Sequence, residues 1–215
     1  MELTRVAVVV SALVAAAAPV AAQERPPPVW PPAFSVNFSE TTSDIINSYN
    51  TTGAWSYDFS NARQRIDRAT GKFDRFCGSV DPVDAPCTHL VLEGVRWLVW
   101  PTQAKCCSCC TSAQGCGIVK PTWMRDSNGT WAGTAPYNSP VWAGSADSWE
   151  ITGGQPNYWF VEAGTSDPVG FAQVPDDYQY LDPTTYVVGA QPDSLFALPS
   201  YCTAKCSGIN TCTLV

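Results

Sequence analysis

The stretch HLVLEGVRWLVWP, residues 89–101, has the pattern of a β-hairpin. Two apolar, β-branched runs flank Glu93 and Gly94, and a short Gly-containing connection between such runs favours a tight turn. In the second run, side chains at alternate positions point to opposite faces of a strand: Val95, Trp97 and Val99 on one, and Arg96, Leu98 and Trp100 on the other. The stretch therefore predicts a pair of antiparallel strands.

The same alternation recurs on both sides of this hairpin. Further strands are predicted in FSVNFSE (34–40), AWSYDFS (54–60), ARQRIDRATGKF (62–73) and NYWFVEAGTSDPVGFAQV (157–174). The 18 prolines and 15 glycines break the chain at short intervals, as in proteins built from many short strands. The sequence thus predicts a mainly β fold with antiparallel sheets that bury one face.

Other segments lack a clear strand pattern. Residues 121–156 are rich in Trp, Gly and Pro and are predicted to be irregular. The few short helices expected are placed near SDIINSYN (43–50) or PDDYQYL (175–181).

The N-terminal residues have the pattern of a secretory signal peptide. Arg5 precedes an apolar run over 6–18, and Val20 and Ala22 are the small residues of a cleavage site, so residues 1–22 are predicted to be removed. The run is too short to span a bilayer comfortably, although a retained anchor is the alternative. We therefore expect a secreted, extracellular protein without a membrane span.

Four segments follow from this pattern. The signal peptide, residues 1–22, is followed by the Pro-rich QERPPPVWPPA (23–33), an extended linker or a strap over the surface. A β domain over 34–202 and a cysteine-containing tail over 203–215 complete the chain. Three N-glycosylation sequons agree with secretion: Asn37, Asn50 and Asn128.

The acidic composition of the chain argues against some classes of binding partner. The formal net charge is -7 and only 14% of residues are charged. Nucleic acids and anionic membrane surfaces attract basic patches, so neither is an expected partner.

The cysteines predict disulfides. Ten is an even number, which allows five bridges and no free thiol in an oxidising compartment. The cysteines are Cys77, Cys87, Cys106, Cys107, Cys109, Cys110, Cys116, Cys202, Cys206 and Cys212. A zinc site is not expected, because the chain has one histidine, His89, two residues after Cys87.

Five of these cysteines lie in KCCSCCTSAQGC, residues 105–116. Adjacent cysteines rarely bond to each other, so each of the two CC pairs should send its sulfurs to different partners. If the run is extended, Cys107 and Cys109 face one way and Cys106 and Cys110 the other. Their candidate partners are Cys77, Cys87, Cys202, Cys206 and Cys212, with the connectivity left open.

Motifs for catalysis are missing from the sequence. It contains no Gly-x-Ser-x-Gly, no His-Glu-x-x-His and no phosphate-binding glycine loop. His89 is interpreted as a hydrogen-bonded residue at a strand end. The pairs Asp176/Asp177 and Asp81/Asp84 could indicate a glycosidase or a calcium site, but Asp is also common in Pro-rich turns. The expectation is a non-enzyme without a cofactor, with calcium as the one candidate ion.

The order of several motifs resembles the ependymin-related family. The matching stretches are SYDFSNARQRID (56–67), LEGVRWLVWPTQAKCC (92–107), YWFVEAGTSDPVGFAQV (158–174) and PDSLFALPSYC (192–202). These relatives are secreted glycoproteins with a fold similar to the bacterial lipoprotein carriers (LolA-like). The resemblance implies a curved antiparallel sheet, as a half-barrel or two stacked sheets, around an apolar pocket for lipid, and calcium-sensitive behaviour outside the cell.

The resemblance also implies part of the disulfide pairing. One of Cys106–Cys110 would bond to Cys202, and Cys77 or Cys87 would bond to Cys206 or Cys212. The doubled cysteine pairs exceed the usual number in the family and suggest a divergent subgroup.

Two functions remain open at this stage. The first is a carrier that buries a hydrophobic small molecule or lipid among aromatic and aliphatic residues of the sheet. The expected pocket residues are Trp55, Tyr57, Phe59, Trp97, Val99, Trp159, Val161 and Phe171. The second is a glycosylated structural subunit of an extracellular matrix, coat or filament, or a homo-oligomer, whose aromatic residues make subunit contacts. An enclosed cavity favours the carrier, and a filled core with aromatic surface patches favours the assembly.

Overall fold

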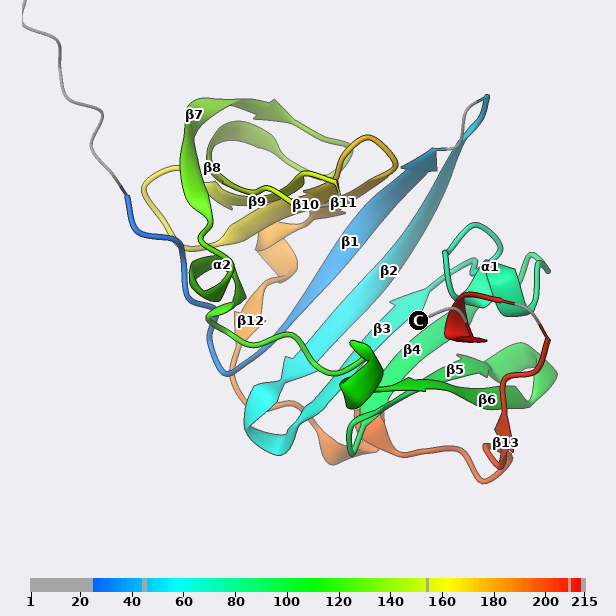
Figure 1. Ribbon diagram of the computed structural model, residues 1–215. Helices are drawn as coiled ribbons and strands as arrows, with labels where there is room; N and C mark the ends of the chain where they lie inside the picture. Colours follow the sequence, from blue (N-terminus) through cyan, green and yellow to red (C-terminus); the bar gives the residue numbers. More distant parts are fainter. Residues whose placement is uncertain (1–24, 44–45, 154, 209, 214–215) are drawn as a thin grey trace, which may run out of the picture.

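The computed structural model describes residues 25–43, 46–153, 155–208 and 210–213 (Figure 1). The predicted signal peptide, residues 1–22, lies outside the described residues. In the described part of the chain, the strands join into one open, curved sheet. The strands are β1 (Ala33–Ser43), β2 (Ser48–Asp58), β3 (Arg63–Arg68), β4 (Cys87–Leu92), β5 (Val95–Trp100), β6 (Lys105–Thr111), β7 (Thr130–Asn138), β8 (Ala143–Ile151), β9 (Asn157–Glu162), β10 (Pro168–Gln173), β11 (Asp177–Leu181), β12 (Val187–Val188) and β13 (Ala204–Lys205).

Helical segments are short. The α-helices of the described residues are α1 (Cys77–Val80) and α2 (Trp123–Asp126). The 3₁₀ turns are η1 (Phe59–Asn61), η2 (Pro101–Gln103), η3 (Ser112–Gln114), η4 (Pro183–Thr185), η5 (Asp193–Phe196) and η6 (Thr211–Thr213). The prediction of a mainly β, disulfide-linked fold with few short helices is confirmed.

The sheet consists of two antiparallel meanders. Strands β1 to β6 follow one another in space, strands β7 to β11 do the same, and the two sets meet where β1 pairs with β11. The short β12 pairs with β1, and β13 pairs with β6 in parallel. Residues 112–129 connect β6 to β7 and cross in front of β1 and β2 (Figure 1).

The hairpin predicted for residues 89–101 is confirmed, whereas the prediction for residues 121–156 is wrong. Glu93 and Gly94 connect β4 to β5 with φ angles of 51° and 74°, which fits a tight two-residue turn. Residues 121–156 are not irregular, because they form α2, β7 and β8. The alternation in β7 is hard to see because Gly133 and Pro136 interrupt it and the pairing is irregular between Trp131 and Gly133.

The helix predicted near residues 175–181 is instead strand β11, whose Gln179 and Leu181 are buried while Tyr178 and Tyr180 are half-buried. In the other helix prediction, Ser48–Asn50 begin β2. Residues 44 and 45 of that stretch lie outside the described residues.

The two faces of the sheet differ in what covers them. We call the face that carries Phe34, Trp55 and Trp159 the inner face, since register places these side chains on the same side. The opposite, outer face carries Ser35, Asn37 and Ser39 of β1. The N-terminal residues 25–32 and the crossing segment cover part of the inner face (Figure 1). The inner face therefore holds the main core.

All ten cysteines form disulfides, as predicted. The pairs are Cys77–Cys87, Cys106–Cys202, Cys107–Cys206, Cys109–Cys212 and Cys110–Cys116. Neighbouring cysteines go to different partners, and Cys107 and Cys109 share one buried cluster while Cys106 belongs to another.

The pairing implied by the family resemblance is correct in one part and wrong in the other. Cys202 does bond to a cysteine of the 105–116 run. Cys77 and Cys87, however, bond to each other, because the loop between β3 and β4 returns the chain to its own start beside Gly71. The tail cysteines Cys206 and Cys212 therefore pair with β6.

Candidate functional site

The inner face carries an aromatic compartment, which we define by its buried residues and the rings packed on them. Its buried members are Trp30, Phe34, Val36, Phe38, Trp55, Tyr57, Met124, Trp149, Ile151, Trp159, Val161 and Leu181. Trp30 does not come from the sheet. It comes from the Pro-rich leader, and its ring lies 4.7 Å from that of Trp159 and 5.2 Å from that of Trp55, measured between ring centroids.

Residues 25–32, which we call the strap, close the compartment. The backbone N–H of Trp30 donates to the carbonyl oxygen of Pro121 at 3.0 Å. At the other end of the strap, Arg25 forms an ion pair with the buried Asp147. The backbone carbonyl oxygen of Arg25 accepts a hydrogen bond from the indole N–H of Trp149 at 3.4 Å. The strap is also held by its tryptophan: Trp30 is only 7% exposed, and its indole packs against the rings of the compartment.

A cavity of about 200 Å³ lies between the strap and the sheet. Its walls are residues 28–31 of the strap, with Phe34 and Trp159 of the compartment. The remaining lining comes from the β9–β10 turn, Tyr186 and Val188. Because its walls are mostly rings and aliphatic groups, the cavity suits an apolar guest.

The compartment also contains unused hydrogen-bond donors. The indole nitrogens of Trp30, Trp55 and Trp123 are buried, and none has a hydrogen-bond partner within the part of the chain that the structure describes. The hydroxyl of Tyr57, by contrast, donates to the carbonyl oxygen of Val119 at 2.7 Å. A buried donor without an acceptor costs about 1–3 kcal/mol, so a ligand oxygen reaching one of these indoles would bring a gain in free energy.

The structure brings together six of the eight residues predicted to line a pocket. Trp55, Tyr57, Trp159 and Val161 are buried in the compartment, and Phe59 and Phe171 pack against it. Trp97 and Val99 do not join them. They lie on the opposite face of β5, in a cluster with the Cys106–Cys202 disulfide and Leu198 and Tyr201. Alternation along β5 shows that Trp97 and Val99 share a face, but it does not say which face joins the compartment.

Sequence reasoning missed Trp30 as a compartment residue. It lies in PPPVWPP, which the sequence predicts only as a linker or a strap. A single tryptophan inside a proline run was the available signal, since a Trp side chain gains much from burial.

A buried ionic cluster continues the inner face beyond the aromatic compartment. On β1, the apolar series Phe34, Val36, Phe38 continues with Glu40, which is 3% exposed. Arg68 of β3 binds Glu40 with two hydrogen bonds of 2.5 and 2.8 Å. Gln179 of β11 donates to the same carboxylate at 2.7 Å.

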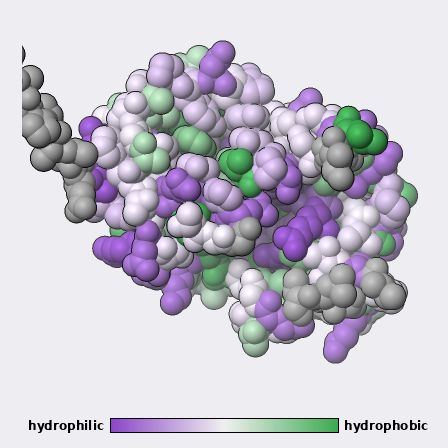
Figure 2. Space-filling model, turned by 45° about the horizontal axis from the view of Figure 1, so that its top comes forward, coloured by the Kyte–Doolittle hydropathy of each residue, from purple (hydrophilic) through white to green (hydrophobic). Residues whose placement is uncertain are grey.

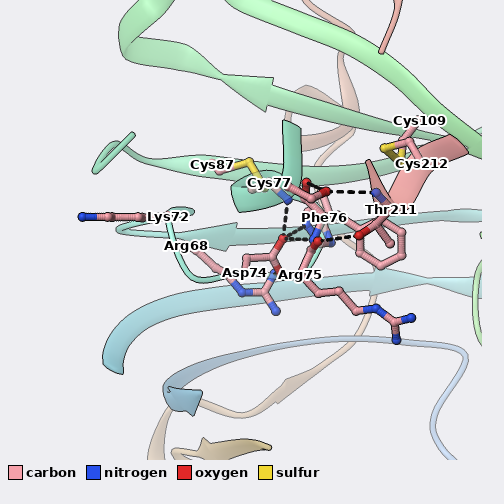
Figure 3. Close-up of polar contacts among 12 residues, drawn as sticks. Arg68, Lys72, Asp74, Arg75, Phe76, Cys77, Cys87, Cys109, Thr211 and Cys212 are labelled. Carbon is pink, nitrogen blue, oxygen red and sulfur yellow. Dashed lines mark hydrogen bonds and ion pairs between the residues drawn. A yellow bond between two sulfur atoms is a disulfide. The ribbon is translucent and has the colours of Figure 1, made fainter. Parts of the chain in front are cut away.

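Asp74 extends the cluster toward α1 and β4 (Figure 3). It lies 3.3 Å from Arg68 as an ion pair, and its Oδ1 accepts from the backbone N–H groups of Phe76 and Cys77 at 3.0 and 2.7 Å. The Nε2 of His89 lies 2.8 Å from the same oxygen. Asp74 thus joins the start of α1 to the sheet.

Burial and neighbouring charges shift the pKa values in this cluster. Burial lowers the pKa of His89 more than Asp74 raises it, so the imidazole is neutral at pH 7 and donates its Nε2–H to Asp74. Burial alone would raise the pKa of Asp74, but its contacts with His89, Arg68 and the Cys77 amide hold it well below the usual range. Asp74 is therefore ionised.

Asp177 shows the opposite shift. Burial and then the nearby Glu40 raise the pKa of Asp177 to about 7. Among the described residues, one oxygen of Asp177 is buried without a hydrogen-bond partner. Asp177 therefore keeps its proton at mildly acidic pH.

Replacing Asp177 by Asn is expected to make the protein more stable at pH 8. The folded-state pKa of Asp177 is above its unfolded value, so its ionisation destabilises the fold progressively as the pH rises from about 4 to about 7. Since a tenfold change in proton affinity is about 1.4 kcal/mol, we expect Asp177→Asn to gain on the order of 2–4 kcal/mol at pH 8. Urea unfolding at pH 5 and pH 8 measures this.

The exposed neighbour provides the control. Asp176→Asn should leave the free energy of unfolding nearly unchanged at both pH values. If Asp177→Asn changes the free energy of unfolding by the same amount at pH 5 as at pH 8, Asp177 does not titrate in this range.

The donor atoms of Asp74, Cys77 and His89 lie within 4.8 Å of one another, but they do not suit a metal. The Cys77 sulfur is bonded to Cys87, and Asp74 is occupied by Arg68, His89 and two backbone amides. Among the acidic pairs from the sequence, Asp81 pairs with Lys105 and Asp84 accepts from Thr70. The other pair separates, since Asp177 lies near Glu40 and Asp176 is exposed.

The geometry defines a curved antiparallel sheet whose inner face holds a strap-closed aromatic compartment beside an ionic cluster. No family model matches the chain, and no curated protein matches it. Among solved structures, an uncharacterized conserved protein from Thermus thermophilus matches 78% of this chain and 86% of its own, with a TM-score of 0.48 and 8% identity.

A LolA superfamily protein from Nitrosomonas europaea is also among the structural neighbours. It matches 77% of this chain and 90% of its own, with a TM-score of 0.35 and 12% identity. Similarities at this level say nothing about a ligand or an activity of this chain. Among the described residues, no helix has the length and apolar character needed to cross a membrane.

Proposed function

We propose that this chain is a secreted, non-catalytic protein that binds a hydrophobic small molecule or lipid in the aromatic compartment. The observation that carries the proposal is the cavity of about 200 Å³ between the strap and the rings of Phe34 and Trp159. Five disulfides and the leader pattern support a place in an oxidising, extracellular compartment. Membership of the ependymin-related family remains part of this proposal.

The lining indicates the chemistry of the ligand. Aromatic faces and prolines favour a flat or chain-like apolar body, because burial of apolar surface contributes about 25 cal/mol per Å². The free indole N–H groups favour a ligand that carries an oxygen acceptor. Asp167 lies in the cavity wall and the chain is acidic overall, so a neutral acceptor such as a hydroxyl or carbonyl suits the site better than a carboxylate.

The size of the cavity gives the strap a role. Pockets for drug-sized ligands hold about 300–1,000 Å³, so the closed cavity admits only a small guest or the end of a chain. A larger ligand would need the strap to move, with Trp30 leaving the space between Trp55 and Trp159. On the face in Figure 2, strongly hydrophobic residues are few and scattered, so this face offers no broad apolar surface as an alternative site.

The test is the binding of a neutral fluorescent apolar probe to the delipidated full chain. Energy transfer from the compartment tryptophans to the probe reports binding inside the compartment. We expect saturable binding that a neutral long-chain alcohol displaces. The proposal is contradicted if no such probe gives energy transfer and native mass spectrometry detects no bound lipid. Oligomers in the same mass spectra would then favour the alternative function, a structural subunit.

Two neighbouring residues provide a matched pair of variants. Val187 and Val188 of β12 are both more than half exposed, but only Val188 lines the cavity. Val188→Asp places a strongly hydrated carboxylate in the wall of the cavity, where an apolar probe would have to displace its water, so probe affinity should fall at least tenfold. Val187→Asp should bind as the natural protein does. Equal effects of the two changes would place the probe elsewhere.

A further inference from the structure

The middle of the outer face is a trough lined mainly by small side chains. One part, of about 540 Å³, is lined by Asn37, Thr52, Ala54, Asp67 and Ala69, among others. A neighbouring part, of about 300 Å³, shares Thr52 and Ala69 and includes Ser39, Asn50 and Thr70. Both parts are open, so the short side chains of β1, β2 and β3 leave this stretch of sheet uncovered.

On either side of the trough, the outer face has its own cover. Over β4 to β6, Leu198 and Tyr201 pack with Val99 and the Cys106–Cys202 disulfide. Over β9 to β11, a layer of rings includes Phe160 and Tyr180, each within 6.5 Å of Tyr137 from the β7–β8 hairpin. The trough is the stretch between these two covered regions.

Two of the three sequon asparagines line the trough. Asn37 is exposed, and its contacts with Thr185 and Asp182 use its backbone N–H and carbonyl groups. Asn50 is exposed, and its side-chain Oδ1 accepts from Thr41 at 2.7 Å. An N-glycosidic bond forms at Nδ2, so this hydrogen bond can persist in a glycosylated Asn50 and would fix the direction of the linkage.

We propose that Asn37 and Asn50 carry N-linked glycans whose first sugars lie in the trough and cover the middle of the outer face. The bond joins the Nδ2 of each asparagine to the first N-acetylglucosamine, which an activated lipid-linked oligosaccharide donates while its diphosphate leaves and Nδ2 loses a proton. Tethering places each sugar beside its site, so weak contacts suffice. The trough volume is in the range that holds a ligand of drug size, comparable to a disaccharide.

The lining of the trough suits neutral sugars. Thr52, Ser39 and Thr70 carry hydroxyl groups that can donate and accept, while Ala54 and Ala69 provide small apolar surfaces for the sugar rings. The carboxylate of Asp67 accepts from Arg65 and Thr88, so it adds an ordered acidic edge that disfavours an anionic occupant. Asn128, the third sequon, lies apart, at the end of the turn that follows α2, with φ at 55°.

The test uses the full chain produced in animal cells, with glycopeptide mass spectrometry of protein from the medium and from the secretory compartments. We expect both Asn37 and Asn50 to be occupied. Peptide-N-glycosidase should release these two glycans at least tenfold more slowly from the native protein than from the denatured protein. An unmodified Asn37 or Asn50, or equal rates before and after denaturation, would overturn the proposal.

A variant that fills the trough separates a specific cover from the general resistance of folded glycoproteins. Ala54→Trp occupies the part near Asn37 and should raise the native release rate at Asn37 toward the denatured rate. Ala135→Trp, at an exposed position of β7 outside the trough, should leave the rate at Asn37 unchanged. Equal release rates at Asn37 in the two variants would show that its glycan does not lie in the trough.

Discussion

Replacing Arg68 by Met is expected to lower the free energy of unfolding by about 3–5 kcal/mol, because it removes one partner of a buried ionic cluster. The guanidinium is 6% exposed and holds both Glu40 and Asp74. Without the guanidinium, the buried carboxylates of Glu40 and Asp74 would repel each other in a site with little water. Urea unfolding at pH 7 measures the loss.

An exposed ion pair serves as the matched control. Lys105 pairs with Asp81, but the lysine side chain is 43% exposed, so Lys105→Met should cost less than about 1 kcal/mol. Arg68→Lys keeps the charge and loses the two-point contact with Glu40, so its stability should lie between that of the natural protein and that of Arg68→Met. If Arg68→Met unfolds no more easily than Lys105→Met, the cluster does not stabilise the fold.

Replacing Trp30 by Ala is expected to cost about 3–5 kcal/mol and to release the strap. The indole contacts the rings of Phe34, Trp55, Tyr57, Trp123 and Trp159. The rest of the strap is held by the contacts of Arg25 and by two backbone hydrogen bonds, from the N–H of Trp30 to Pro121 and from the N–H of Phe59 to Pro32. The backbone N–H of residue 30, which donates to Pro121, should then exchange its hydrogen faster than in the natural protein, while thermal unfolding reports the loss of stability.

Val29, the neighbouring strap residue, provides the control. It is 50% exposed, so Val29→Ala should change stability by less than about 0.5 kcal/mol and leave hydrogen exchange at the amide of residue 30 unchanged. Unchanged stability and unchanged exchange in Trp30→Ala would mean that the strap is held without its indole, and the strap movement proposed for larger ligands would have to be abandoned.

Alternation was sufficient to predict most of the strands, because each face of a strand meets a different environment. The hairpins of β4–β5 and β9–β10 and the opposite faces of Leu98 and Val99 follow from it. Alternation does not predict that β1 pairs with β11, because this pairing joins residues that are far apart in the chain, such as Phe38 and Leu181.

The same limit applies to the site. The residue pattern of β2 was enough to predict a shared face for Trp55 and Tyr57, and Trp159 was correctly expected beside them. The positions of Trp97 and Trp30 depend instead on how the sheet and the leader fold in space. Glu40 was visible as a charged residue on the apolar side of β1. The partners that neutralise it, Arg68 and Gln179, come from other strands and could not be assigned from the sequence.

The three disulfides that join β6 to Cys202, Cys206 and Cys212 also set an order of events during biosynthesis. Cys106, Cys107 and Cys109 leave the ribosome well before Cys202, Cys206 and Cys212, their sequence separations being 96, 99 and 103 residues. Until translation passes these positions, their native bridges cannot close, and three nascent thiols remain open to mispairing. These three bridges are therefore completed only after residues 202–212 have been synthesised, and a chain truncated before Cys202 would leave Cys106, Cys107 and Cys109 without their native partners.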